Sequence, residues 1–210
     1  MAVQASVLDE KELQAARDEV VREWGRIDIL VNAAGGNLSA ARTDGAPPFV
    51  MSLPSFDDVV RLNLHGTVYP TMIFGETMAS QGKGSVIVIS SMAASQAISG
   101  VLGYSVAKAA IENFTRWMAV DLARRCGPAL RVNAISPGFF VTAQNRDVLL
   151  NPDGSWTERA VAITRRTPMA RFGDPSELQG SVLWLCSDAA SFVTGVVVPV
   201  DGGFSAYSGI

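Results

Sequence analysis

The stretch that most limits the fold of this chain is an apolar run that ends in two hydroxyl side chains. Residues Gly84–Ser91 read Gly-Ser-Val-Ile-Val-Ile-Ser-Ser. A continuous, largely β-branched run of this length is typical of a strand buried on both faces of a parallel sheet. In open α/β sheets, ligands bind beyond the carboxyl ends of the strands. The run therefore predicts an α/β fold with polar groups at its ligand-binding edge.

The rest of the sequence repeats this alternation of strand and helix. Strands are predicted at residues 29–35, 84–91, 130–136 and 196–200, and a further one at residues 3–7. Helices are predicted at residues 10–24, 56–78, 104–125 and 176–187, with a polar loop at 37–53. A covering segment with a short helix near 157–164 is predicted at 139–173. This order favours a doubly wound parallel sheet in one domain of 210 residues.

Two side chains on the helix after the buried strand add a chemical signal. Tyr104 and Lys108 stand four residues apart, so both project from one helical face. Together with Ser91, they bring a phenol, an ammonium and a hydroxyl to the end of one strand. A neighbouring cation favours the phenolate, so we expect the pKa of Tyr104 to lie below its usual value of about 10. Such a phenol can exchange a proton with a carbinol oxygen near neutral pH.

Composition argues against several other classes of protein. The net charge is −3 and no basic run occurs, which argues against a nucleic-acid partner. The apolar stretches are too short to cross a bilayer, so no membrane role is expected. His65 is the one histidine and Cys126 and Cys186 are isolated, so no metal site is expected. Lone cysteines fit thiols in a reducing compartment, and a cytoplasmic location is expected.

The motif Ser91…Tyr104-x-x-x-Lys108, with Asn63 upstream, resembles the catalytic set of the short-chain dehydrogenase/reductase family. The separation of 13 residues between Ser91 and Tyr104 favours Ser91 over Ser90 in this comparison. The resemblance implies that Tyr104 exchanges the hydroxyl proton and that Ser91 holds the substrate oxygen. It also implies that Lys108 binds the nicotinamide ribose and that Asn63 holds a water molecule linking the lysine to solvent. A buried structural asparagine is the alternative for Asn63.

Two turns at predicted strand ends resemble the family's cofactor-binding segments. Asn32-Ala-Ala-Gly35 resembles the Asn-Asn-Ala-Gly turn beside the adenosine ribose, with Ala33 in place of the second asparagine. The segment 137–142 resembles the Pro-Gly-x-x-x-Thr sequence that lines the nicotinamide. The resemblance implies a cofactor, NAD or NADP, without choosing between them. The cofactor-binding residues that it implies are Asn32, Ala34, Gly35, Tyr104, Lys108, Pro137, Gly138 and Thr142.

The family's glycine-rich phosphate loop has no counterpart in this sequence. Residues 3–7 resemble the third strand of the family fold. Residues 1–210 are therefore expected to form a single domain of the family that lacks its first two βα units, roughly 60 residues. The strand at 27–33 would then expose an apolar edge. We expect this polypeptide to bind the dinucleotide weakly or not at all.

Within the family, the sequence resembles the sugar-acid branch, which contains D-mannonate oxidoreductases (fructuronate reductases). Gly35-Gly-Asn37, the run 144–155 and the tail 200–209 carry this likeness. A hexuronate substrate needs a cation for its carboxylate and amides for its hydroxyls. Arg146 would supply the cation, although it could instead be a solvated surface charge. The amides would come from Asn37, Gln144 and Asn145.

Two alternatives to a sugar-acid enzyme stay open at this point. One is a reductase of 3-oxoacyl thioesters, and the other is a non-catalytic or inactive truncated subunit. In all cases a homo-oligomer, dimer or tetramer, is expected. The helix predicted at 104–125 is apolar on nearly every side. Such a helix is usually covered on more than one side, by the sheet and here by a second subunit.

Overall fold

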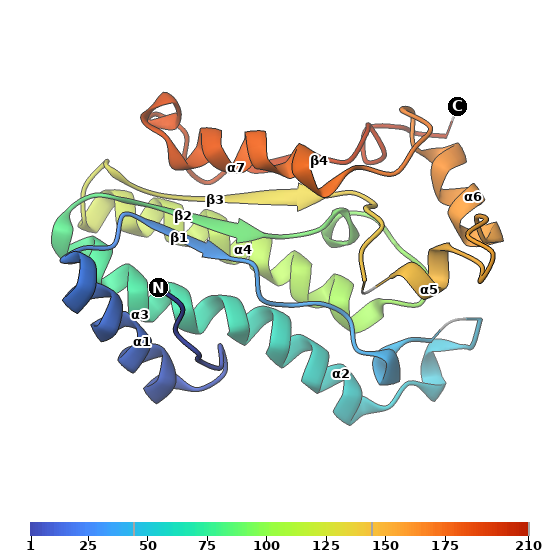
Figure 1. Ribbon diagram of the computed structural model, residues 1–210, viewed down its shortest axis with the longest axis horizontal. Helices are drawn as coiled ribbons and strands as arrows, with labels where there is room; N and C mark the ends of the chain where they lie inside the picture. Colours follow the sequence, from blue (N-terminus) through green and yellow to red (C-terminus); the bar gives the residue numbers. More distant parts are fainter. Residues whose placement is uncertain (44, 144, 210) are drawn as a thin grey trace.

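The computed structural model describes residues 1–43, 45–143 and 145–209. Within them the chain forms a four-stranded sheet in the order β1-β2-β3-β4, with every neighbouring pair parallel. The strands are β1 (Ile29–Asn32), β2 (Gly84–Ile89), β3 (Leu130–Pro137) and β4 (Val197–Val200). Figure 1 shows the strands running towards the end of the molecule that carries α5 and α6. Their carboxyl ends therefore share one edge, as the sequence predicts.

Helices cover both faces of this sheet (Figure 1). The long helices α3 (Gly66–Gln81) and α4 (Leu102–Arg125) lie on one face, with α1 (Glu10–Trp24) outside α3. Helix α7 (Gln179–Cys186) covers the other face. The remaining helical elements are α2 (Leu53–Val60), α5 (Arg146–Leu149), α6 (Glu158–Arg166), a π turn at Arg61–His65, and 3-10 turns at Ser39–Ala41, Pro48–Val50, Met92–Ala94, Pro175–Leu178 and Asp188–Ala190. The predicted doubly wound α/β fold is confirmed.

The structure shows why strand β2 carries an apolar run after Ser85. Val86 and Val88 pack into the core formed with α3 and α4. Ile87, between them, points to the opposite face and packs with Leu185 of α7. All four side chains are fully buried. Burial of each is worth about 1.5–3 kcal/mol, so both faces stabilise the strand at the centre of the sheet.

Helix α1 has the predicted bounds because local signals fix both ends. The Asp9 carboxylate accepts hydrogen bonds from the backbone N–H groups of Lys11 and Glu12, which caps the first turn. Gly25 ends the helix in the left-handed conformation, with φ at 75°.

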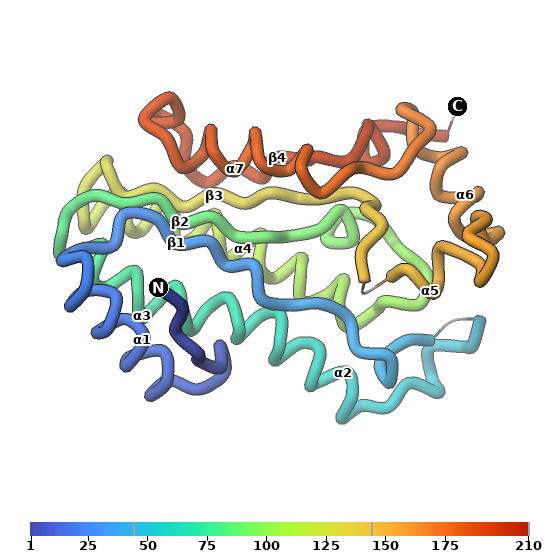
Figure 2. Tube along the Cα trace, viewed as in Figure 1, coloured from blue at the N-terminus to red at the C-terminus, as the bar shows by residue number. Residues whose placement is uncertain are grey.

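The prediction of a strand at residues 3–7 is wrong, because the segment has no strand beside it to pair with. Its backbone is irregular and runs alongside the helices (Figure 2). The Ser6 N–H donates to the Glu12 carboxylate at 2.6 Å. A Cβ placed on Gly66 would lie 3.0 Å from the Val7 Cγ2, so Val7 packs closely against the start of α3. A strand needs a neighbouring strand for its backbone hydrogen bonds, and residues 3–7 lie against helices instead.

Strand β1 forms an edge of the described sheet, since it pairs only with β2. Leu30 packs against the core. Ile29 and Val31 on the other face keep 48% and 41% of their surface exposed. The sheet therefore presents apolar side chains to solvent beside its first strand.

Helix α4 is apolar on two sides, and the sheet covers only one of them. Ile111 and Met118 are buried in the core, whereas Trp117 and Val120 are 61% and 55% exposed. The predicted second cover, from another subunit, stays a prediction. Of the helices in the described ranges, none has the length and hydropathy that a membrane span requires.

Candidate active site

The two serines that follow β2, Ser90 and Ser91, make different contacts. Ser91 caps the 3-10 turn Met92–Ala94, and its Oγ accepts the Ala93 N–H at 3.2 Å. The same hydroxyl forms a hydrogen bond with the phenol of Tyr104. Ser90 is 1% exposed and donates to the Glu112 carboxylate at 3.0 Å. The structure thus places Ser91, and not Ser90, beside Tyr104.

Lys108 lies behind Tyr104 on the same face of α4, as the spacing predicts. Its Nζ is 5.5 Å from the centre of the Tyr104 ring and donates to the Ile89 carbonyl at 2.6 Å. The residue is only 4% exposed, and burial lowers the pKa of its ammonium to about 8. The arrangement groups a phenol, an ammonium and a hydroxyl at the carboxyl edge of β2.

The expected depression of the Tyr104 pKa is wrong for this structure. Burial raises the pKa of the phenol, and the hydrogen bond with Ser91 offsets only part of that effect. The physical reason is that removal from water disfavours the phenolate more strongly than its hydrogen bond favours it. The sequence spacing specifies the neighbours of Tyr104 but not the depth at which they are buried.

The ammonium of Lys108 has spare donor capacity. It carries three N–H donors, and among the described residues its hydrogen bond goes to one acceptor, the Ile89 carbonyl. A buried cation with unused donors is costly, so a ligand with adjacent hydroxyls would satisfy it. The ribose of a nicotinamide dinucleotide has this chemistry, and Lys108 therefore fits the role that the family resemblance implies.

Asn63 is fully buried in the π turn between α2 and α3. Its Nδ2 donates to the carbonyls of Gly36 and Val59, at 2.7 and 2.9 Å. Its Oδ1 accepts the Gly36 N–H at 3.0 Å. The side chain thus holds the turn after β1 by two opposed hydrogen bonds, which matches the structural alternative. Its role in holding a water stays a prediction.

The turn after β1 lies open next to this asparagine. Asn32 is buried and its Nδ2 donates to the Thr71 hydroxyl at 2.9 Å, which ties β1 to α3. Ala34 and Gly35 are exposed. A Cβ on Gly35 would lie 2.7 Å from the Asn63 Oδ1, closer than real Cβ atoms come. Only glycine fits, which explains the small residue here.

The segment after β3 is also shaped by a close approach. Strand β3 ends at Pro137, and the Gly138 N–H donates to the Val200 carbonyl at 2.9 Å. A Cβ on Gly138 would lie 2.6 Å from the Asp201 Cα. Thr142 is held by Asn145, whose Oδ1 accepts the Thr142 N–H at 2.8 Å.

A pocket of about 330 Å³ opens at this edge of the sheet. It is lined by Ser91 and Tyr104, and by two of the predicted substrate residues, Asn37 and Asn145. The Oδ1 of Asn37 is buried and accepts no hydrogen bond from a described residue. An unpaired buried acceptor of this kind is uncommon in folded proteins.

The other predicted substrate residues are not in this pocket. Arg146 is exposed and lines a separate depression beside Asp147 and Asn151. Gln144 lies outside the described residues. Two arginines that the sequence analysis did not name, Arg42 and Arg159, line the pocket instead. The signal that could have indicated Arg159 is its place in the short helix of the covering segment, which folds over the carboxyl edge.

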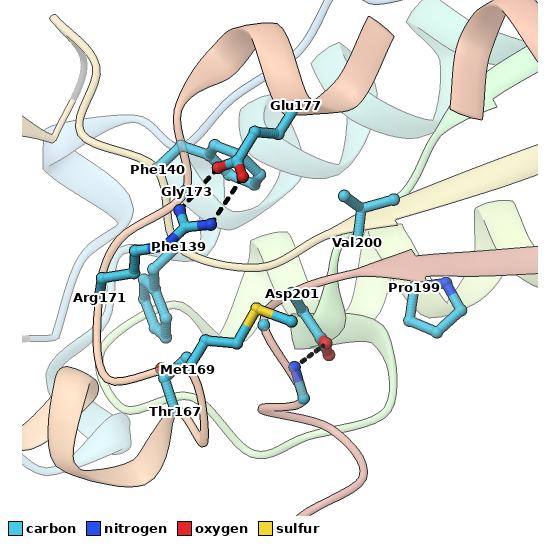
Figure 3. A pocket seen from close by; sticks show the side chains of 12 residues that line it. Phe139, Phe140, Thr167, Met169, Arg171, Gly173, Glu177, Pro199, Val200 and Asp201 are labelled. Atoms are coloured by element: carbon cyan, nitrogen blue, oxygen red, sulfur yellow. Dashed lines mark hydrogen bonds and ion pairs between the residues drawn. The ribbon is translucent and has the colours of Figure 1, made fainter. Parts of the chain in front are cut away.

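A second pocket, of about 360 Å³, shares Phe139 with the first, and Figure 3 shows its lining residues. Arg171 and Glu177 face each other there in a two-pronged ion pair, with both N–O distances at 2.7 Å. The Arg171 guanidinium holds the pKa of the Glu177 carboxyl well below its usual range. Asp201 accepts the Gly203 N–H at 2.9 Å. These charged groups brace the pocket walls, and the reactive hydroxyls line the other pocket.

In the described part of the chain, no group of histidine, cysteine, aspartate and glutamate side chains could hold a metal ion. The groups placed at the site are hydroxyls, an ammonium and amides. They can orient a carbinol or carbonyl group and exchange a proton with its oxygen.

Comparison with known proteins gives consistent matches. A family profile described as enoyl-(acyl carrier protein) reductase matches residues 1–205. The uncharacterized oxidoreductase UxuB of Bacillus subtilis is 44% identical over 219 residues, which cover 100% of this chain and 78% of that protein.

Solved structures agree with this result. A Haemophilus influenzae protein assigned as a D-mannonate oxidoreductase, with NAD bound, superposes with a TM-score of 0.92 at 40% identity. The match covers 100% of this chain and 78% of that one. A gluconate 5-dehydrogenase from Burkholderia cenocepacia, in complex with NADP and tartrate, gives a TM-score of 0.84 at 31% identity. That match covers 96% of this chain and 73% of the other.

Proposed function

The chain belongs to the short-chain dehydrogenase/reductase family of NAD(P)-dependent oxidoreductases, and we propose that it transfers a hydride between the cofactor and a sugar acid such as mannonate or fructuronate. The observation that carries this proposal is the contact of Ser91 and Tyr104 in a pocket that also holds two arginines. The hydroxyl pair suits a carbinol oxygen, and the cations suit an acid.

Each residue of the site has a part in the proposed reaction. When bound, the nicotinamide supplies or accepts the hydride. Ser91 donates a hydrogen bond to the substrate oxygen and orients it towards Tyr104. Tyr104 gives its proton to that oxygen during reduction and takes one during oxidation. Lys108 binds the ribose, and its ammonium lies close to the phenol of Tyr104.

The family resemblance leaves the raised pKa of Tyr104 to be explained. A neutral phenol is the form that a reductase needs, because reduction of a carbonyl requires a proton donor. A high pKa keeps Tyr104 protonated across the neutral range. For the oxidative direction the phenol has to lose that proton, so the proposed enzyme should oxidise alcohols faster as the pH rises.

Similar proteins support the substrate class. The Haemophilus influenzae structure carries the D-mannonate assignment, and the Burkholderia enzyme acts on gluconate and binds tartrate, a hydroxy acid. The pocket volume of about 330 Å³ lies at the low end for ligand sites and suits a small substrate. Both NAD and NADP occur in these relatives, so both are proposed as cofactors.

The test is reduction of fructuronate and oxidation of D-mannonate, followed by nicotinamide absorbance, with each dinucleotide supplied at high concentration because weak cofactor binding is expected. We expect turnover of the acids, and much slower turnover of D-mannitol and of an acetoacetyl thioester. Faster reduction of the thioester would replace the sugar-acid proposal with the acyl-reductase alternative. No turnover of any of them would support the non-catalytic alternative.

Homo-oligomerisation through α4 is part of the proposal. Leu102, Val106, Trp117 and Val120 are 44–61% exposed and form an apolar surface on that helix. Large exposed apolar patches mark interaction sites. Sedimentation at micromolar concentration should give a dimer or tetramer, and Trp117→Glu should shift it towards monomer. A wild-type monomer would contradict this part.

A cytoplasmic location is proposed as well. Cys126 and Cys186 are both free thiols in the structure, which suits a reducing compartment. Fractionation that recovers the protein outside the cytoplasm would contradict this.

A further inference from the structure

We infer that the side-chain carbonyl of Asn37 accepts a hydrogen bond from a hydroxyl of the substrate, and that this contact selects polyhydroxy acids over substrates without a second hydroxyl group. The inference rests on the proposed function. It also separates Asn37 from Asn145, two amides for which the sequence predicts the same role.

The first argument is an acceptor without a donor. The Asn37 Oδ1 is buried and has no hydrogen-bond partner among the described residues. Within those residues, the Ser105 hydroxyl is the other buried side-chain atom in this state, and Ser105 does not line the pocket. Asn37 does line it, together with Ser91 and Tyr104. A buried carbonyl oxygen without a donor is costly, so a ligand that brings a donor to it binds more tightly.

The backbone beside Asn37 is fixed, so a shift of the turn cannot easily carry this oxygen out to water. Gly36 is buried, its N–H donates to the Asn63 Oδ1 at 3.0 Å, and its carbonyl accepts the Asn63 Nδ2 at 2.7 Å. Asn63 is itself fully buried. The terminal torsion of an asparagine amide is soft, and rotation about it can turn the Asn37 oxygen towards a group in the pocket. A rigid turn thus carries an adjustable acceptor at the pocket wall.

Asn145, the other amide of the pocket, already uses its acceptor. Its Oδ1 accepts the Thr142 N–H at 2.8 Å and the Thr142 hydroxyl at 3.3 Å. Its Nδ2 donates to the Phe140 carbonyl at 2.7 Å. A carbonyl oxygen has two lone pairs, so the Asn145 oxygen has none left for a substrate. Asn145 therefore shapes the segment after β3, and Asn37 is the amide left for recognition.

The rest of the lining increases the need for an acceptor. Ile98, Val101 and Leu149 are apolar, and the guanidinium of Arg159 can only donate. The described residues that line the pocket include no aspartate or glutamate. A sugar acid carries several hydroxyl groups, each of which loses a water acceptor when it enters. A hydroxyl of the substrate finds a replacement in the Asn37 carbonyl.

This contact would also favour sugar acids over the alternative substrates. A 3-oxoacyl thioester has no hydroxyl group to donate, so it would leave the Asn37 oxygen unpaired. Sites that hydrogen-bond a substrate hydroxyl discriminate strongly against an analogue that lacks it. Asn37 is therefore a specificity determinant, whereas Ser91 and Tyr104 contact the reacting oxygen.

The test combines Asn37→Ala with the monodeoxy analogues of D-mannonate, in which one hydroxyl at a time is replaced by hydrogen. Binding is measured by calorimetry with NAD at high concentration, and kcat/KM is measured for the same ligands. At least one analogue should bind to the wild type about tenfold or more weakly than D-mannonate. Asn37→Ala should weaken D-mannonate by a similar factor and leave that analogue within about twofold, because the contact is already lost.

Asn145→Ala and Asn151→Ala are the controls. Asn145→Ala removes bonds within the segment after β3, so it should weaken D-mannonate and every analogue by the same factor. Asn151 is exposed and does not line the pocket, so its variant should leave all the ligands unchanged. Equal weakening of D-mannonate and of every analogue in Asn37→Ala would overturn the inference.

Thermal stability gives a second readout that needs no activity. Because the Asn37 Oδ1 has no donor in the ligand-free chain, Asn37→Ala should leave the melting temperature unchanged or raise it. Asn145→Ala should lower it, since that amide is fully bonded. A clear fall in Asn37→Ala would show that the oxygen is paired in the folded protein, and the inference would fail.

The same measurements separate this inference from the proposed reaction. If the wild type oxidises D-mannonate and every monodeoxy analogue equally well, the proposed function stands and the role of Asn37 is refuted. If it binds D-mannonate with the expected dependence on Asn37 but does not oxidise it, the proposed function fails and the role of Asn37 stands. A wild type that does not bind D-mannonate at all would contradict both.

Discussion

Replacement of Asn63 by alanine should destabilise the fold strongly, because this one side chain holds the turn that borders the proposed cofactor site. The Gly36 N–H and C=O both bond to its amide, and Gly36 is itself buried. Each buried polar group left without a partner costs about 1–3 kcal/mol, so the two together cost about 2–6 kcal/mol. Native domains have only about 5–15 kcal/mol in total. We expect the free energy of unfolding to fall by an amount in the lower half of this range, because water that enters the site can hydrogen-bond part of the turn.

The assay is urea unfolding followed by tryptophan fluorescence. Asn151→Ala is the matched control, because Asn151 also donates two side-chain hydrogen bonds but is exposed, so its loss should cost less than about 1 kcal/mol. Asn63→Asp keeps the shape but sets a carboxylate against two carbonyl oxygens, which raises the folded-state pKa of the new group. Its stability relative to wild type should therefore be best at low pH and fall as the pH rises. A loss in Asn63→Ala no larger than in Asn151→Ala would show that Asn63 does not hold this turn.

Three further predictions follow from the site. Lys108 has its pKa lowered from 10.5 to about 8, so its ammonium destabilises the fold below pH 8 and this penalty fades as the pH rises towards 10.5. Across that window the free energy of unfolding of the wild type should rise by up to about 3 kcal/mol, at 1.36 kcal/mol per pKa unit. Lys108→Met should lack this rise. Gly138→Ala should cost about 1–3 kcal/mol, because its Cβ would lie 2.6 Å from the Asp201 Cα; an unchanged melting temperature would disprove that overlap. Ser91→Ala should lower kcat about tenfold or more. Ser90→Ala loses a hydrogen bond to Glu112 but should leave kcat unchanged. Equal effects of the two variants on kcat would count against the catalytic role of Ser91.

Elements and contacts could be predicted from the sequence where local interactions determine them. The ends of α1 were predictable because Asp9 and Gly25 act within one turn of the helix. Strand β2 was predictable because burial on both faces favours the apolar run Val86–Ile89. The pairing of Ser91, Tyr104 and Lys108 follows from the helical repeat and from the sheet edge.

Other features depend on the tertiary surroundings. Residues 3–7 have the composition of a strand, but a strand requires a partner, and the helices α1 and α3 hold this segment instead. The direction of the Tyr104 pKa depends on burial, which spacing does not reveal. Arg42 and Arg159 are 117 residues apart in the sequence, and only the folded chain brings them to one pocket.

The role of Tyr104 in proton exchange is tested most directly by the turnover number of Tyr104→Phe with the best sugar acid and its preferred dinucleotide. This variant keeps the ring beside Lys108 and removes only the hydroxyl. We expect a fall in kcat of at least about a hundredfold, the contribution of a positioned general acid, with binding of the acid unchanged. Activity within a few-fold of the wild type would show that Tyr104 does not exchange the proton.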